Sequence, residues 1–473
     1  MPNLVATLAL LVWPLVALYL YRTRPLAQAT LWTILGAQML LPVGAEIKLH
    51  EGIPGLDKVS LPNIATLIGC LLLVQRPSRM WRRFGFAGVL ILMNLVGPFI
   101  TAELNGDPII VGNTVLPSET HYDAVSAAFN QFLFVLPFFV GRLVLRGSTE
   151  NEETLRVLAI AGLLYSIPML LEIRLSPQLH FWLYGYYPSE FLQQMRENGF
   201  RPVVFMGHGL IVAFFAMTTA VAAAALWRIR SPIMRLQPGI VTGYLSVLLV
   251  LCKSLGALSY GAVLVPLVRL ATPRLQLRVA LVLVSVALLY PLLRTTDLFP
   301  TTGMVEVAKS ISGERANSLE FRFTNEDRLL QRASQRLFFG WGRFGRSRVY
   351  DESGKDVSVT DGFWIIVLGT YGLFGFIAEF GLLVFPVVRA VSAVKFVESK
   401  REAVLLGALA LIIATNVVDL LPNATISPWT WLLAGALLGR VESIWASARR
   451  QIQSRSNFTK QGIGNIKTKS RTS

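Results

Sequence analysis

SLEFRFTNEDRLLQRASQRLFFGWGRFGRSRVYDESGKDVSVTDGFWIIVLGTYGLFG, residues 318–375, is a charged stretch in a chain that is otherwise mostly apolar. Its charged side chains include Arg322, Arg328, Arg332, Arg336, Arg343, Arg346, Arg348, Glu320, Glu326, Asp327 and Asp361. The sequence on either side is apolar enough to lie in a bilayer. Because ionisable residues are costly in such surroundings, their concentration here predicts that the chemistry of the protein takes place in this stretch.

The composition is typical of a polytopic membrane protein. Of the 473 residues, 53% are hydrophobic and 15% are charged. Backbone polar groups in a bilayer must be satisfied within the protein, and the period-2 alternation of barrel strands is absent, so the predicted fold class is all-α. Met1 to Arg22 lacks a basic n-region and an A-x-A site, so we expect it to form the first span rather than a cleaved signal peptide.

The cysteines, the histidines and the net charge indicate which kinds of site and ligand are not expected for this chain. Cys70 and Cys252 lie in apolar runs and the four histidines are scattered, so we expect neither a disulfide framework nor a metal, and no cofactor. The net charge of +16 comes largely from short loops between apolar runs, which is the positive-inside pattern and not a nucleic-acid footprint. The basic residues after Trp445 predict a disordered tail against anionic headgroups.

Apolar runs predict about 12 to 14 transmembrane spans, each needing about 17 to 25 residues. The runs are 4–21, 27–45, 60–75, 84–102, 124–144, 155–173, 203–227, 238–252, 254–270, 276–294, 373–394, 403–420 and 428–445. Residues 361–372 are predicted to form a short re-entrant or interfacial segment, because a full span there would place the next basic loop outside.

Basic clusters in the connecting loops predict the orientation. The clusters are Arg22 with Arg24, Arg76 with Arg79, Arg82 and Arg83, Arg142 with Arg146, Arg228 with Arg230 and Arg235, Arg269 with Arg274 and Arg278, and Lys395 with Lys400 and Arg401. If these are cytoplasmic, the N-terminus is outside, the C-terminus is inside, and 174–202 and 295–372 are two large outer loops.

We therefore expect one membrane domain with four parts. Residues 1–294 hold the first ten spans and the outer loop 174–202, and 295–372 form the second outer loop. Residues 373–446 hold the last spans, and 447–473 form the basic tail. Fixed-period repeats and Gly/Ser-rich linkers are absent from the sequence, which favours a single domain.

An amphipathic helix is predicted inside the second outer loop. Thr324 followed three residues later by Asp327 is a capping-box pattern that starts a helix. Leu329, Leu330, Ala333 and Leu337 then share one face, while Arg328, Arg332 and Arg336 form an adjoining stripe. This stripe either contacts lipid phosphate at the interface or binds substrate. The run 340–345, GWGRFG, predicts a tight turn after the helix.

Four single residues are candidates for chemistry, each with a structural alternative. Arg201, at the outer end of a span, either anchors that span or binds an anion through its planar fork. His208 is either a satisfied core residue or catalytic. Lys253, between two apolar runs, is either a loop charge or the partner of an anion. Asp361 either caps the following helix or acts as a general base for a sugar hydroxyl.

Four short motifs resemble the O-antigen ligase and polymerase superfamily of bacterial inner-membrane proteins, over about residues 195–380. Arg201–His208 is similar to the Arg-x-x-x-Phe-x-Gly-His signature after the first outer loop, with Gly209-Leu210 in place of Pro-Asn. KSLGA from Lys253 is similar to a Ser-Arg-Gly-Ala stretch. RLLQRASQRLFFGWG from Arg328 and DGFW…GLFG from Asp361 are similar to the signatures of the second outer loop.

The resemblance implies a type-C glycosyltransferase fold and metal-independent transfer of a glycan from a polyprenyl pyrophosphate. It implies pyrophosphate contacts from Arg201 and Arg328, with Lys253, Arg322 and Arg332 as further candidates and His208 and Arg346 as possible ones. It also implies acceptor activation at Asp361, where ligases carry His. This difference favours a polymerase of exopolysaccharide or O-antigen repeat units over a ligase that loads glycan onto lipid A core or protein.

The implied chemistry agrees with the residue types. Pyrophosphate is a good leaving group, so a transferase needs cations to stabilise its developing charge and a positioned base. The expected partners are the lipid-linked donor, the glycan acceptor, membrane lipid, and chain-length and export proteins, at the periplasmic face of the bacterial inner membrane. A transporter or flippase is the alternative from another class, favoured by ionisable residues near span ends: Glu172, Glu379, Arg389 and Asp419.

Overall fold

The computed structural model describes residues 2–48, 55–73, 85–196 and 199–469, and it is 73% helical. Its elements, in chain order, are α1 (Leu4–Thr23), α2 (Leu26–Leu40), β1 (Glu46–Ile47), β2 (Leu56–Asp57), α3 (Ser60–Leu73), α4 (Gly85–Glu103), β3 (Ile109–Val111), β4 (Thr114–Leu116), α5 (His121–Val144), α6 (Ser148–Leu175), α7 (Leu179–Tyr184), η2 (Phe191–Gln194), β5 (Met195–Arg196), β6 (Gly199–Phe200), α8 (Gly209–Arg228), α9 (Pro238–Leu251), α10 (Leu255–Leu270), α11 (Pro273–Thr295), α12 (Thr301–Ile311), α13 (Gly313–Ser334), α14 (Phe363–Ala393), η3 (Val394–Phe396), α15 (Lys400–Asp419) and α16 (Pro428–Lys469).

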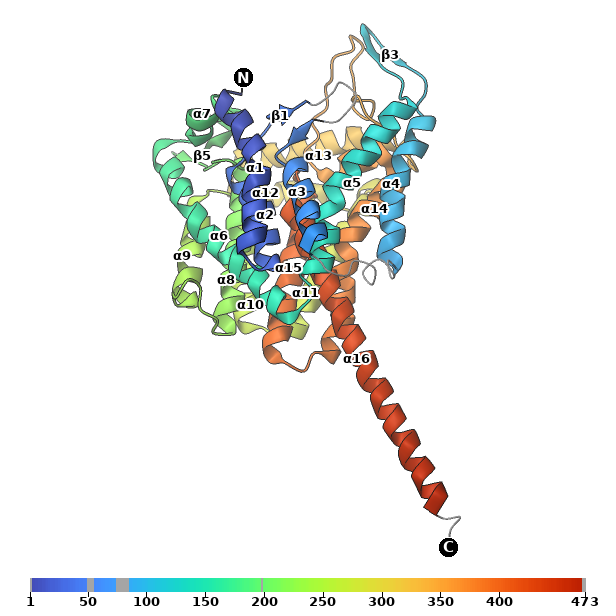
Figure 1. Cartoon of the computed structure of the whole chain (residues 1–473). Helices are drawn as coiled ribbons and strands as arrows, with labels where there is room; N and C mark the ends of the chain where they lie inside the picture. Colours follow the sequence, from blue (N-terminus) through green and yellow to red (C-terminus); the bar gives the residue numbers. More distant parts are fainter. Residues whose placement is uncertain (1, 49–54, 74–84, 197–198, 470–473) are drawn as a thin grey trace.

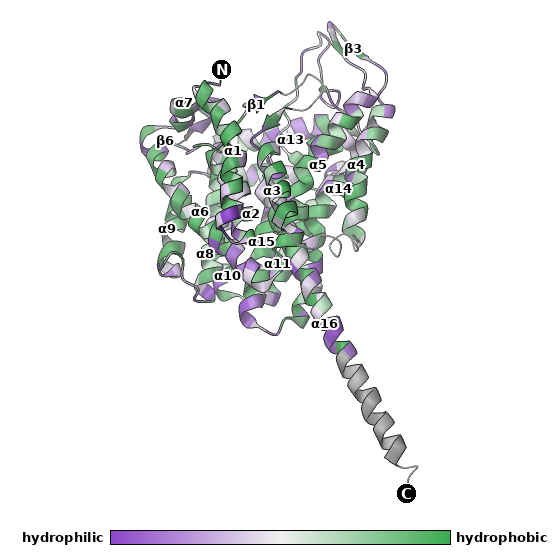
Figure 2. Ribbon diagram, in the orientation of Figure 1, coloured by the Kyte–Doolittle hydropathy of each residue, from purple (hydrophilic) through white to green (hydrophobic). Residues whose placement is uncertain are grey.

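The helices form a bundle whose outer surface is apolar. Eight described helices are long and apolar enough to cross a membrane: α1, α4, α5, α6, α8, α11, α14 and α15. Three shorter apolar helices, α3, α9 and α10, pack among them. Figure 2 shows hydrophobic residues along the sides of the bundle and hydrophilic ones mainly toward its ends. The chain is therefore a multi-pass, all-α membrane protein, as the sequence predicted.

The two termini lie at opposite ends of the bundle (Figure 1). The β1–β2 and β3–β4 hairpins, both antiparallel, lie at the end that holds the N-terminus. Helices α12 and α13 lie across this same end, and we call it the loop end. The predicted basic cluster at Arg76–Arg83 falls outside the described residues.

Helices α8 and α15 lie in the centre of the bundle. Their apolar windows are 89% and 83% buried, compared with 28% for α1 at the periphery. Alanines and glycine make α8 slim enough for α6, α9 and α10 to pack closely around it. Because α8 begins and α15 ends at the loop end, the residues at those two termini are held by the most buried part of the protein.

The predicted span 203–227 begins later than expected, at Gly209. The carboxylate of Glu172 accepts hydrogen bonds from the backbone N–H groups of Val203 and Val204, both at 2.7 Å. Val204 and Gly207 adopt positive φ values of 47° and 90°. These contacts hold residues 201–208 as an irregular segment in front of α8, which hydropathy alone could not distinguish from a helix.

The start predicted for the amphipathic helix is wrong. α13 begins at Gly313, so Thr324 lies inside the helix and is not its cap. Glu326 and Asp327 instead contact Arg294 at the end of α11, at 3.4 and 2.6 Å. Burial raises the pKa of Glu326, which also accepts a hydrogen bond from the Tyr290 hydroxyl. The acidic residues therefore fix α13 to α11.

The apolar face of α13 is as predicted at three of its four positions. Leu329, Leu330 and Ala333 are buried, whereas Leu337 is 37% exposed. The helix ends at Ser334 and is followed by turns in which Gly340, Gly342 and Gly345 all have positive φ, in agreement with the turn expected at 340–345. The last helix, in contrast to the predicted disordered tail, continues without interruption from Pro428 to Lys469.

The predicted segment 361–372 is mostly helical and is separated from the following span by a break. Helical residues 363–371 are joined to the rest of α14 at Gly372, which has φ 65° and ψ −162°. This conformation is accessible to glycine and almost to no other residue. A Cβ at position 372 would also lie 2.3 Å from the backbone carbon of Phe338.

Gly372→Ala is therefore expected to destabilise the folded protein by about 1–3 kcal/mol from backbone strain alone, with the clash adding to it. Thermal unfolding of the purified protein in detergent would measure the loss. Gly243→Ala is the matched control, because Gly243 lies in helix α9 with no atom within 4 Å of an added Cβ. Equal melting temperatures for the two variants would contradict the strain argument.

Candidate functional site

A cavity of about 1280 Å³ opens at the loop end, where α8, α10, α12, α13 and α15 approach one another. Five of the residues predicted from the sequence line it: Arg201, His208, Lys253, Arg322 and Asp361. They come from four separate parts of the chain. The volume exceeds that of a typical drug-sized pocket, about 300–1,000 Å³.

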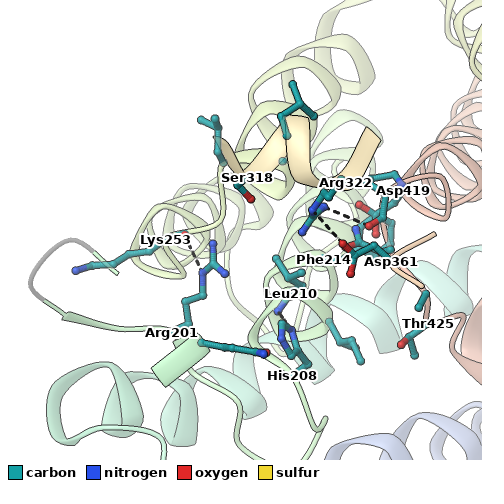
Figure 3. A pocket seen from close by; sticks show the side chains of 18 of the residues that line it. Arg201, His208, Leu210, Phe214, Lys253, Ser318, Arg322, Asp361, Asp419 and Thr425 are labelled. Carbon is teal, nitrogen blue, oxygen red and sulfur yellow. Dashed lines mark hydrogen bonds and ion pairs between the residues drawn. The ribbon is translucent and has the colours of Figure 1, made fainter. Parts of the chain in front are cut away.

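Arg201 and Lys253 lie on one side of this cavity (Figure 3). The Arg201 Nε donates a hydrogen bond of 3.1 Å to the backbone carbonyl of Lys253, and the Arg201 backbone N–H donates to Gln194 at 2.8 Å. The arginine is therefore fixed to the protein within the cavity wall. This placement supports the anion-site alternative over anchoring of a span in the headgroups.

Lys253 connects α9 to α10 with a φ of 50°, which bends the chain sharply between the two short helices. Its ammonium group lies beside Gly199, where an added Cβ would be 2.3 Å from Nζ. The side chain is partly buried. Arg201 and Lys253 together define what we call the cationic side of the cavity.

His208 has a structural role, which was one of the two alternatives that the sequence left open. It also lines the cavity. It is the N-cap of α8, and its Nδ1 accepts a hydrogen bond of 3.2 Å from the Leu210 backbone N–H. A side chain that caps the N-terminus satisfies one of the unpaired N–H groups of the first turn. His208 therefore fixes the beginning of the central helix next to Arg201.

Arg322 and Asp361 lie on the other side (Figure 3). The Arg322 Nε is 3.6 Å from Asp361 Oδ2, and its guanidinium also donates to the carbonyl of Pro422 at 3.3 Å. About a third of each side chain is exposed. Asp361 does not cap α14, because the N-cap is Gly362 and no side chain there accepts a hydrogen bond.

Asp419, which in the sequence favoured only the transporter alternative, also lines this side. It is the last residue of the central helix α15, and Arg322 and Asn423 are its charged and hydrogen-bonding neighbours. Asn416, Asn423, Thr425 and Trp429 line the cavity around it. The signal in the sequence was a group of polar residues at 416–427 between two apolar helices.

Arg332 and Arg346, predicted as binding or possible residues, do not line the cavity. Arg346 is fully buried and donates to the carbonyls of Trp341, Asp107 and Pro117. Arg332 donates to the carbonyl of Arg346 and stacks on Trp341 at 3.4 Å. Burial lowers the pKa of both arginines. Arg346 thus joins its turn to the segments before β3 and after β4, and Arg332 joins α13 to the same turn.

Arg328 is exposed on α13 and is not part of the cavity wall. Within the described part of the chain it makes no hydrogen bond or ion pair. The stripe predicted at Arg328, Arg332 and Arg336 is therefore divided, with one exposed residue and two that contact the protein. Among the described residues, the arginine of α13 that lines the cavity is Arg322, six residues before Arg328.

Arg328→Ala is expected to change any activity of the cavity less than twofold, because exposed charges away from a site contribute little. Arg322→Ala, on the same helix, should have a large effect, since it removes the partner of Asp361 and the contact with Pro422. The two variants must be compared at equal amounts of protein in the membrane. A strong defect in Arg328→Ala with a mild one in Arg322→Ala would contradict the placement of the site.

The comparisons with known proteins do not assign the chain to a family: no protein-family model and no curated protein matches it. Among the described residues, no group of three or more His, Cys, Asp or Glu side chains is placed to hold a metal ion. The fold defines the class, a multi-pass α-helical membrane protein with a large polar cavity at one end of its bundle.

Proposed function

We propose that this protein is a membrane glycosyltransferase that joins polyprenyl-pyrophosphate-linked oligosaccharide units into a surface polysaccharide. The observation that carries the proposal is the arrangement of the cavity. Two cations, Arg201 and Lys253, line one side, and an Arg322–Asp361 ion pair lines the other. In this proposal the loop end faces the periplasm of a bacterial inner membrane, where lipid-linked units are assembled.

The proposed reaction uses each side of the cavity for one reactant. A hydroxyl oxygen of the acceptor sugar attacks the anomeric carbon of the donor, and the bond from that carbon to the pyrophosphate oxygen breaks. The electron pair leaves with the pyrophosphate, whose growing charge Arg201 and Lys253 stabilise. The hydroxyl proton passes to Asp361, which acts as general base.

The geometry of Asp361 suits a base. Its distance of 3.6 Å to Arg322 is too long for a hydrogen bond, so the pair is held by charge. Among the described residues no group donates a hydrogen bond to the Asp361 carboxylate, so its oxygens remain accessible to a ligand or water.

The test is the lipid-linked material in a deletion strain. Loss of a polymerase should leave single oligosaccharide units on the lipid, outside the cytoplasm, with no polymer, and the wild-type gene should restore it. Full-length polymer that remains on the lipid would instead indicate a ligase. Units that stay on the cytoplasmic face would indicate a flippase, and unchanged polysaccharide would overturn the proposal.

A further inference from the structure

The polar groups contributed by residues 416–429 are the part of the cavity that the proposed reaction does not use. Asn416, Asp419, Asn423 and Thr425 line the wall there, together with the aromatic ring of Trp429. Sugar hydroxyls both donate and accept hydrogen bonds, so a ligand with several of them needs carboxylate, amide and hydroxyl partners. A cationic phosphate site would not need these groups.

The contacts of this segment show that it is held rigidly. The side-chain amide of Asn416 donates a hydrogen bond of 2.9 Å from Nδ2 to Thr430 Oγ1. The acceptor of this amide is its oxygen, Oδ1. Trp429 is 3% exposed and packs against Phe214 and Phe215 of α8. The backbone carbonyls of Leu420 and Asn423 accept hydrogen bonds from the Phe363 N–H at 3.0 Å each.

Asp419 and Asp361 share Arg322 as their cationic neighbour (Figure 3). Arg322 therefore reduces the repulsion between two carboxylates that line one cavity, and its donors are already directed at Asp361 and Pro422. A ligand with a carboxylate of its own would meet two carboxyl groups here. A neutral or an amino sugar would meet two hydrogen-bond acceptors.

We propose that residues 416–429 form the acceptor-sugar subsite, in which Asp419 accepts hydrogen bonds from hydroxyls of a neutral or amino sugar and orients the reacting hydroxyl toward Asp361. This inference rests on the proposed function and adds the substrate class of one side of the site. Asp361 takes the proton, and Asp419 binds the sugar that supplies it.

The experiment uses purified protein in nanodiscs and the lipid-linked oligosaccharide extracted from the deletion strain as donor. The same oligosaccharide, released from its lipid by mild acid, is the soluble acceptor. Asp419→Asn is expected to raise the KM for this acceptor about tenfold, the effect of a weakened hydrogen bond, while kcat changes less. Its affinity for inorganic pyrophosphate should stay within twofold of wild type, which also shows that the cavity is folded.

Thr425→Val is a milder second variant that keeps the shape of the side chain and should raise the same KM without affecting pyrophosphate binding. A wild-type acceptor KM in both variants would overturn the subsite although the proposed function would stand. Loss of pyrophosphate binding in Asp419→Asn would also overturn the acceptor-sugar subsite. An acidic sugar at the reacting end of the acceptor would contradict the substrate class. Absence of transfer by the wild-type protein would refute the proposed function itself.

Discussion

Asp361→Asn is expected to lower the rate of glycan transfer about 10²–10⁴-fold, the range usual for loss of a general base. Asparagine has nearly the same shape but cannot accept the proton of the acceptor hydroxyl. Because Asp361 does not cap α14 and is a third exposed, the substitution should leave the fold intact. In the cell it should leave single lipid-linked units in place of polymer.

Transfer measured with extracted lipid-linked oligosaccharide gives the rate, and thermal unfolding gives the stability of the variant. Glu306→Gln is the matched control, because it also neutralises a carboxylate, and Glu306 is exposed on α12 and outside the cavity wall. A rate in Asp361→Asn within a few-fold of the control would exclude Asp361 as the base. A general loss of folded protein would identify it as a structural residue.

Arg201→Ala is expected to reduce transfer about 10²–10³-fold, as removal of one preorganised donor to a developing oxyanion does in other enzymes. The guanidinium is fixed through Nε to the carbonyl of Lys253 and lines the cavity, and a planar guanidinium matches the geometry of phosphate oxygens. Inorganic pyrophosphate should bind the variant more weakly as well. Arg201→Lys keeps the charge without the planar fork and should restore only part of the rate.

The control for this series is Arg174→Ala, at the end of α6, where the arginine is exposed. It should retain wild-type transfer and pyrophosphate binding. High salt should weaken pyrophosphate binding to wild type more than to Arg201→Ala, because one charge–charge contact is missing in the variant. Equal affinity for pyrophosphate in wild type and Arg201→Ala would show that the anion lies elsewhere.

The predictions for Arg201 and Asp361 test opposite sides of the cavity independently. Arg201 variants should weaken pyrophosphate binding, whereas Asp361 and Asp419 variants should not. A transporter with the same helices would require both sides for net movement of substrate and would form no glycosidic bond. The buried Glu379, which accepts a hydrogen bond of 3.0 Å from Gln131 inside the bundle, is the residue that such a function would use first.

Most of the helices were predictable from the sequence because their signal is local. A run of apolar residues in a bilayer has to satisfy its own backbone hydrogen bonds, so each of the thirteen predicted runs corresponds to a helix in the structure. Arg201, His208, Lys253, Arg322 and Asp361 were chosen from the sequence and line the cavity, whereas Arg328, Arg332 and Arg346 were chosen from it as well and do not. Their residue type and position in the chain made them candidates but did not say which of them lie together.

Only the tertiary structure decided which charges lie together. Arg332 and Arg346 are of the same residue type as Arg322 and lie in the same stretch, but Arg346 donates to backbone carbonyls of segments more than 200 residues earlier in the chain, and Arg332 donates to the carbonyl of Arg346. Asp419 joins Asp361 because α15 ends where α14 begins. Ion pairs and carbonyl contacts depend on separations of a few ångströms between distant segments, and no local pattern in the sequence specifies those separations.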